Sequence, residues 1–144
     1  MTVMKILRVK GEGPVYTVPP TSTIAETAEI LSARRIGALV VSRDGKVPLG
    51  IVSERDIVRE VGKRGAACLG DPVTVVMTEK LVTCTRTDGA VEVLQRMTDG
   101  RFRHMPVMDG AEMVAVISIG DVVKMRLGEL AMERDALEDM VKGH

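Results

Sequence analysis

A strand-to-helix junction occurs twice in this chain of 144 residues, and it constrains the fold more than any other feature. Residues 50–58 read Gly-Ile-Val-Ser-Glu-Arg-Asp-Ile-Val, and residues 115–123 repeat this order of small, apolar and polar residues. The Ser-x-x-Asp motif keeps its register, because Ser118 and Asp121 each stand 65 residues after Ser53 and Asp56. An apolar run that ends in Ser-x-x-Asp and continues as an amphipathic run predicts a strand, a helix N-cap and a helix.

The rest of each half follows the same order. The matching segments are 15–18 with 81–84, 36–41 with 102–107, and the Asp-Gly pairs at 44–45 and 109–110. Apolar residues at helical spacing also match, namely Ala25, Ala28 and Leu31 with Val91, Leu94 and Met97. Corresponding residues of the two halves are 66 positions apart before the Asp-Gly turn, and 65 positions apart from that turn onward. A repeat of about half the chain predicts two like units that bury a shared face.

Each half is predicted to be a β-α-β-β-α unit. In the first half, strands are expected at 15–18, 36–41 and 49–52, with a hairpin turn at Asp44-Gly45. Thr23-x-x-Glu26 has the pattern of a capping box and predicts the start of the first helix. The second helix is expected over 56–61 and is expected to end at Gly62. Short helices are expected ahead of the two units, at 2–7 and 73–77.

These elements divide the chain into a lead-in helix and linker, a first repeat, a connecting segment, a second repeat and a C-terminal helical extension. The corresponding ranges are 1–14, 15–65, 66–80, 81–130 and 131–144. The last helix carries residues spaced alternately by four and three, as in a heptad seam: Val123, Leu127, Leu130, Arg134, Leu137 and Val141. Two interpretations stay open, an amphipathic tail lying on its own domain and a helix that pairs with a second copy.

Composition narrows the class of protein. With one Tyr, one Phe, no Trp and ten Met, the core must be aliphatic, and base-stacking nucleic-acid modules are disfavoured. The formal net charge of +0 also makes nucleic acid or an anionic membrane an unlikely partner. No apolar run approaches the roughly 20 residues that cross a bilayer. Cys68 and Cys84 are scattered, which favours buried thiols in a reducing compartment, so the expected location is cytoplasmic.

Two such units, each closing with Gly/Ala, two apolar residues and Ser-x-x-Asp, resemble the cystathionine-β-synthase (CBS) domain family. The segment Arg-His-Met-Pro-Val at 103–107, followed by Asp-Gly and Val-Ile-Ser-Ile-Gly-Asp-Val-Val-Lys, is typical of it. The resemblance implies an α/β (α+β) fold in which two CBS repeats are related by a pseudo-twofold axis. It also implies a stand-alone Bateman module that binds AMP, ADP, ATP, NAD(H) or S-adenosylmethionine between the repeats and forms a homodimer.

The Ser-x-x-Asp motifs are suited to the sugar of such a nucleotide. A helix N-terminus attracts anions, and a serine hydroxyl there can donate to a phosphate or ribose oxygen. An ionised carboxylate can accept both hydroxyls of a ribose diol. We therefore expect Asp56 and Asp121 to bind ribose, with Ser53 and Ser118 beside them. The alternative is a plain helix cap, worth about 1 kcal/mol without any ligand.

Adenine needs an apolar slot and main-chain hydrogen bonds. The resemblance implies that the strands at 36–41 and 102–107 line the base pocket, with Thr17 and Thr83 near its rim. The residues assigned to this pocket are Ile36, Gly37, Ala38, Met105 and Pro106. The alternative is that both segments are simply core strands.

Phosphates need cations, and the two halves differ in them. Arg55 has Gly120 as its counterpart, whereas Arg101, Arg103 and His104 stand where the first half has Arg35, Gly37 and Ala38. We expect Arg55, Arg103 and His104 to take part in binding, and the two sites to differ in affinity. Each arginine could instead be a solvated surface charge. His104 could also titrate near neutrality and make binding depend on pH.

Catalysis is not expected. The chain has no phosphate-binding loop of the Walker type, no dinucleotide fingerprint and no His-Glu-x-x-His metal motif. Ser53 and Ser118 have no paired base in the sequence pattern. The leading hypothesis is a regulatory module, without catalytic cofactor or metal, that binds an adenine nucleotide and signals energy or redox state to an unknown partner protein. The alternative is a ligand-independent dimeric interaction module.

Overall fold

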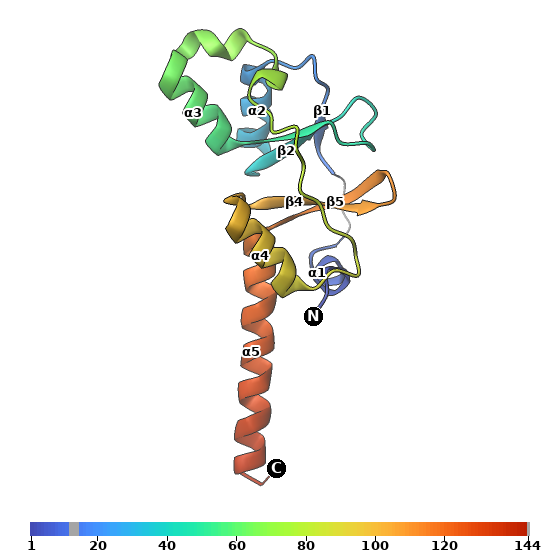
Figure 1. Ribbon diagram of the computed structural model, residues 1–144. Coiled ribbons are helices and arrows are strands. Elements are labelled where there is room, and N and C mark those ends of the chain that lie inside the picture. The colour runs from blue at the N-terminus through green and yellow to red at the C-terminus, as the bar shows by residue number, and fades with distance from the viewer. Residues whose placement is uncertain (12–14, 144) are drawn as a thin grey trace.

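The structure is a computed structural model that describes residues 1–11 and 15–143. Two halves lie one above the other, and a long helix projects away from them (Figure 1). The first half contains β1 (Thr17–Val18), α2 (Ile24–Arg34), β2 (Ala38–Val41), β3 (Gly50–Ser53) and α3 (Glu54–Arg64). The second contains α4 (Ala90–Gly100), β4 (His104–Asp109), β5 (Glu112–Ser118) and α5 (Ile119–Val141). The predicted α/β (α+β) class is confirmed.

The first sheet has the order β1-β2-β3, with β1 parallel and β3 antiparallel to β2. The second consists of the antiparallel pair β4-β5. The segments ahead of the two repeats form helices: α1 (Val3–Lys10), and the 3₁₀ turns η1 (Ala66–Gly70) and η2 (Val73–Val75). The helix expected at 73–77 is thus a single 3₁₀ turn. No helix in the described part of the chain is long and apolar enough to cross a membrane.

Each half has its own aliphatic core, and each lead-in segment packs on the opposite half. Val3, Ile6 and Leu7 of α1 are buried in the core of the second half, beside which α1 lies in Figure 1. Val73 of η2 is buried in the core of the first half. Corresponding main-chain hydrogen bonds hold each lead-in segment on the opposite half, because Val3 N donates to Asp88 O (2.9 Å) and Val73 N donates to Ser22 O (2.7 Å). This exchange brings residues 10–11 and 78–82 to the junction between the halves.

The prediction of a strand at 81–84 is wrong. In the described structure only Cys84 pairs with β4, through an isolated parallel bridge to Val107. The corresponding segment of the first half pairs twice, as Thr17 with Val40 and Val18 with Val41. Pro106 stands in the place of Val40, and a proline has no N–H to extend the ladder.

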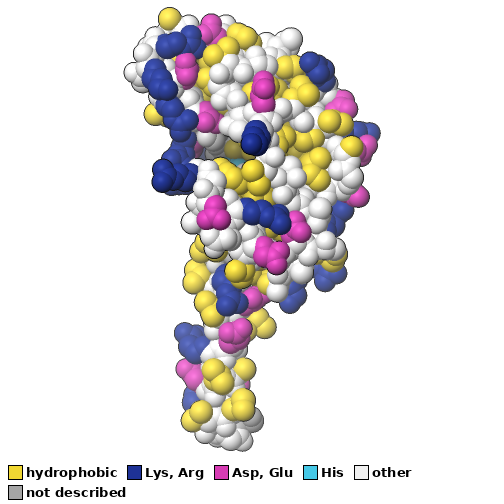
Figure 2. Space-filling model, in the orientation of Figure 1, with side chains coloured by type: hydrophobic (Ala, Val, Ile, Leu, Met, Phe, Trp, Pro, Cys, Tyr) yellow, Lys and Arg dark blue, Asp and Glu magenta, His cyan; other side chains and the backbone are white. Residues whose placement is uncertain are grey.

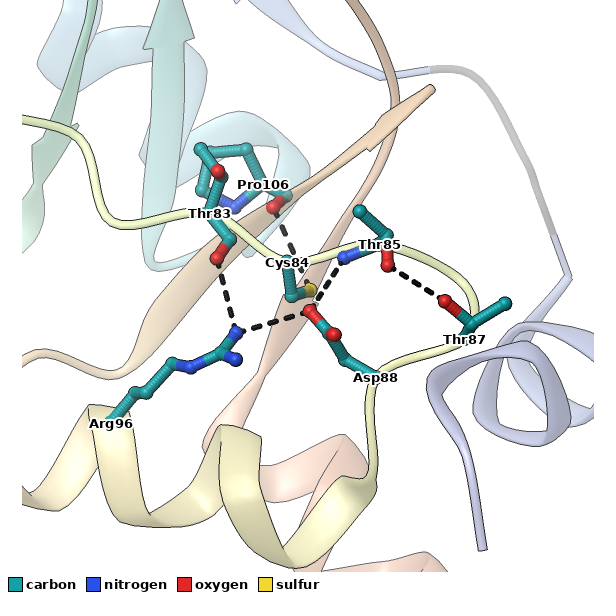
Figure 3. A network of polar contacts seen from close by, with 7 residues as sticks. All are labelled: Thr83, Cys84, Thr85, Thr87, Asp88, Arg96 and Pro106. Carbon is teal, nitrogen blue, oxygen red and sulfur yellow. Dashed lines mark hydrogen bonds and ion pairs between the residues drawn. The ribbon is translucent and has the colours of Figure 1, made fainter. Parts of the chain in front are cut away.

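Side chains hold the segment after residue 82 in the place of that strand (Figure 3). Arg96 Nη1 donates to Thr83 O (3.3 Å) and pairs with Asp88 Oδ2 (3.1 Å). The same Asp88 oxygen accepts a hydrogen bond from Thr85 N (2.9 Å). These contacts join the segment to α4, and they have no counterpart in the first half, where Ile30 replaces Arg96.

One helix end differs from expectation, and the course of α5 bears on the two interpretations left open for the last helix. Helix α3 does not end at Gly62 but continues to Arg64, because Gly65, with a φ of 72°, is the residue that leaves the helical path. Helix α5 does not lie on its own domain, since beyond its first turns it projects into solvent (Figure 1). Val122 is the one residue of α5 that is buried within the described structure.

Candidate functional site

Both Ser-x-x-Asp motifs form complete capping boxes. Asp56 Oδ2 accepts hydrogen bonds from Ser53 N (2.8 Å) and Ser53 Oγ (3.0 Å), and Ser53 Oγ accepts from Asp56 N (3.3 Å). Asp121 Oδ2 accepts from Ser118 N (2.8 Å), and Ser118 Oγ accepts from Asp121 N (3.1 Å). The cap interpretation is therefore correct for both motifs. It leaves Oδ1 of each carboxylate outside the cap, so a further role as a ligand stays compatible with it.

The first motif lines a cavity of about 360 Å³, which we call the Ser53 cleft. Its wall is built from the β3–α3 junction and β2 of the first half, the connecting segment, and the end of α4 with β4 of the second. The lining residues are Gly37, Ala38, Ile51, Ser53, Glu54, Arg55, Asp56, Arg59, Thr78, Lys80, Leu81, Val82, Gly100, Arg101, Phe102, Arg103, His104 and Pro106. Asp56 Oδ1 lies 3.6 Å from Arg59 Nη1, a group of opposite charge.

The second motif borders a cavity of about 480 Å³, which we call the Ser118 cleft. Its wall combines β5 with the segment before β1 and with β2. The lining residues are Lys10, Gly11, Val15, Tyr16, Arg35, Ile36, Gly37, Ala38, Leu39, Val40, Ile51, His104, Ala115, Val116 and Ser118. Charged groups are fewer here than in the Ser53 cleft.

The two clefts are equivalent under the internal repeat. Val15 and Tyr16 in the Ser118 cleft correspond to Leu81 and Val82 in the Ser53 cleft, 66 residues later. The run 35–38 corresponds to 101–104 in the same way, and Ser118 corresponds to Ser53. The pseudo-twofold relation of the repeats thus extends to the cavities between them.

Ten of the fourteen residues expected at the site line one cleft or the other. They are Ile36, Gly37, Ala38, Ser53, Arg55, Asp56, Arg103, His104, Pro106 and Ser118. Thr17 and Thr83 do not, whereas their neighbours Tyr16 and Val82 do, because successive side chains of an extended chain point to opposite sides. Met105 is fully buried in the core of the second half for the same reason, between His104 and Pro106.

Asp121 is separated from the Ser118 cleft by a lysine that sequence patterns did not identify. Lys10 Nζ of α1 lies 2.6 Å from Asp121 Oδ2 and donates to Val116 O at 2.8 Å. Burial alone would raise the pKa of Asp121, but the hydrogen bonds from Lys10 and Ser118 and the charge of Lys10 outweigh it and hold this pKa below its ordinary value. Lys80 has the same place in its lead-in segment, because it follows Val76 by four residues as Lys10 follows Ile6, and it lines the Ser53 cleft. The similarity of segments 3–7 and 73–77 is the sequence signal that could have identified Lys10 and Lys80 as corresponding residues.

Replacing Lys10 with glutamine should raise the pKa of Asp121. Because the pKa of Asp121 is lowered by folding, its ionised form stabilises the native state above the ordinary pKa of 3.8, and this contribution is lost as pH falls through the lower folded value. Removing the ammonium removes the main opposition to burial. The pKa is read from an NMR titration of the Asp121 carboxyl carbon, with Lys5→Gln on the same helix as control. An unchanged midpoint in Lys10→Gln would contradict the assignment.

His104 forms part of the wall that the two clefts share. Its ring lies against Gly37, where an added Cβ would be 3.1 Å from Cε1. Burial, followed by the positive charge of Lys10, holds the pKa of His104 below 6.5 despite the nearby Asp121 and Glu54. This lowered pKa favours the neutral form of the imidazole, whose ring packs against Gly37.

Comparison with known proteins agrees with this architecture. The family model described as CBS domain matches residues 11–63 and again residues 71–128. A CBS-domain-containing protein from Agrobacterium tumefaciens, of known crystal structure, is 44% identical, with a TM-score of 0.84 and coverage of 88% of this chain and 99% of that one. A CBS domain protein from Pyrobaculum aerophilum, solved in complex with AMP, is 32% identical, with a TM-score of 0.74 and coverage of 84% and 89%.

Curated relatives include proteins of quite different length. The mitochondrial CBS domain-containing protein CBSX3 of Arabidopsis thaliana is 31% identical over 149 residues, which span 99% of this chain and 72% of the relative. Other relatives from the same plant are several times longer, and the alignment covers only 22% or 19% of their length.

Proposed function

This chain belongs to the CBS domain family, and from that premise we propose that it is a non-catalytic regulatory protein that binds an adenine nucleotide between its repeats. The ligand is AMP, ADP, ATP or NAD(H), and its binding changes the affinity for a partner protein. A useful coupling is about 1–3 kcal/mol, which differential contacts to a nucleotide can supply. The buried thiols of Cys68 and Cys84 support a reducing, cytoplasmic setting.

One observation supports this proposal most strongly: a cap carboxylate at the wall of a cavity between the repeats. Asp56 lines the Ser53 cleft, and its Oδ1 is left outside the capping box. A carboxylate so placed can accept the two hydroxyls of a ribose, while Ala38, Ile51 and the main chain beside Pro106 offer a slot for the base. The AMP complex of the relative from Pyrobaculum aerophilum supports the same class of ligand.

Calorimetric titration of the full chain with AMP, ADP, ATP and NADH tests the proposal. Binding is expected for at least one compound, and the pair Asp56→Ala and Asp121→Ala should abolish it. Glu26→Ala is the matched control, because Glu26 completes the capping box of α2 yet lines neither cleft. Loss of binding in Glu26→Ala would indicate that any weakened helix cap has this effect. The absence of heat with all four compounds at millimolar concentration would refute the function.

A second candidate function, interaction between copies of the chain, is favoured by α5. The exposed fraction is 62% for Leu127, 62% for Leu137 and 88% for Val141, all on one face of a helix that projects from the protein. A shallow groove along this face is lined by Leu130, Glu133, Arg134, Leu137, Glu138, Val141 and Lys142. We propose that this face pairs with a second copy to form a homodimer, and that it does so with or without nucleotide.

A further inference from the structure

The Ser53 cleft gathers positive charge in a chain that is neutral overall. Five cationic residues line it, namely Arg55, Arg59, Lys80, Arg101 and Arg103, against two acidic ones, Glu54 and Asp56. The formal net charge of the whole chain is +0. On the face drawn in Figure 2, Lys and Arg side chains form a column down one side of the upper half that reaches the junction with the lower half.

These cations are mostly without partners. Arg59 has Asp56 at 3.6 Å, but the side chains of the other four make no ion pair or hydrogen bond within residues 1–11 and 15–143. Some arginines elsewhere are paired, as Arg64 is with Asp71 (2.7 Å) and Arg96 is with Asp88 (3.1 Å). Positive charges gathered around a cavity raise the local concentration of anions. A single guanidinium group can also donate two parallel hydrogen bonds to a phosphate.

The Ser118 cleft serves as an internal comparison. Its lysine, Lys10, is already engaged with Asp121, whereas the corresponding Lys80 is not engaged. The positions of Arg55 and Arg103 are held there by Gly120 and Gly37. Besides the two lysines, both clefts have a corresponding arginine, Arg35 or Arg101, and both arginines adopt the left-handed conformation, with φ of 53° and 57°. The two clefts are therefore built from corresponding segments but differ in charge.

We propose that the Ser53 cleft selects nucleoside di- and triphosphates over the monophosphate and the free nucleoside, and that the Ser118 cleft lacks this selectivity. The inference rests on the proposed function. Asp56 accepts the ribose hydroxyls, and Lys80, Arg101 and Arg103 together neutralise the charge of the phosphate chain. Because these side chains are exposed, the selectivity weakens as salt concentration rises.

The test is titration with adenosine, AMP, ADP and ATP in low salt with a chelator, followed by amide NMR shifts. Arg55 and Leu81 report on the Ser53 cleft, and Val15 and Val116 report on the Ser118 cleft. We expect ATP to bind at the Ser53 cleft at least about tenfold more tightly than adenosine, and Arg101→Gln with Arg103→Gln to remove about tenfold of ATP affinity while leaving adenosine affinity unchanged. Arg35→Gln, the matched change in the other cleft, should leave ATP affinity at the Ser53 cleft unaltered.

The outcomes separate this inference from the function on which it rests. Equal affinity for adenosine and ATP at the Ser53 cleft would overturn the selectivity while leaving nucleotide binding intact. An equal loss of ATP affinity in Arg35→Gln would also overturn it, because the effect would then be one of net charge. Failure of every adenine compound to shift either set of amides would instead refute the proposed function.

Discussion

Replacing Met105 with alanine should lower the free energy of unfolding by about 2–5 kcal/mol. The side chain is 0% exposed and packs in the core of the second half with Val107, Ile117 and Val122. Truncation would leave a cavity among rigid aliphatic neighbours. The expected decrease in the free energy of unfolding is a large part of the total for a typical domain, which is about 5–15 kcal/mol. Urea unfolding followed by circular dichroism measures the effect.

Met140→Ala is the matched control for this change. Met140 is 75% exposed on α5, so its replacement should alter the free energy of unfolding by no more than about 0.5 kcal/mol. The family resemblance assigned Met105 to the nucleotide site, and the same variants decide that question. A Met105→Ala protein of normal stability but reduced nucleotide affinity would return this residue to the site.

Leu130→Glu combined with Leu137→Glu should halve the mass of the particle measured by sedimentation equilibrium. Both leucines lie on the seam of α5, which extends about 34 Å over its 23 residues. A helix whose outer turns have no tertiary contacts is marginally stable in water, and pairing with a second copy would bury the exposed seam. Two glutamates per chain would place like charges at the centre of that pairing.

Met132→Glu is the control, because residue 132 lies on the opposite face of the helix at 100° per residue. Met132 is 73% exposed and should tolerate the charge without a change of mass. A wild-type particle with the mass of one chain at high concentration would contradict pairing through α5. A double variant that stays dimeric would show that the interface lies on another face of the protein.

Much of the fold was predictable because its signals are local. Capping boxes at Thr23, Ser53 and Ser118 all form, since an N-cap depends on residues within one turn. The errors also have local causes. Pro106 cannot extend the ladder to residue 82, and Gly65, not Gly62, adopts the positive φ that ends α3. Thr17, Thr83 and Met105 do not line either cleft, but each is one residue from a side chain that does, because successive side chains of a strand alternate between its two faces.

By itself the sequence determined the two repeated units, their element order and the paired Ser-x-x-Asp caps, because each depends on periodicity and spacing along a short segment. Only the tertiary structure decided how the lead-in segments cross, with α1 packing on the second half and η2 on the first. That crossing places Lys10 on Asp121, 111 positions away, and brings Lys80 to the Ser53 cleft, where it makes no ion pair with any described residue. The different engagement of Lys10 and Lys80 arises from packing between distant segments, which no local pattern encodes. The replacement of Arg55 and Arg103 by glycines in the other cleft, in contrast, is visible in the sequence.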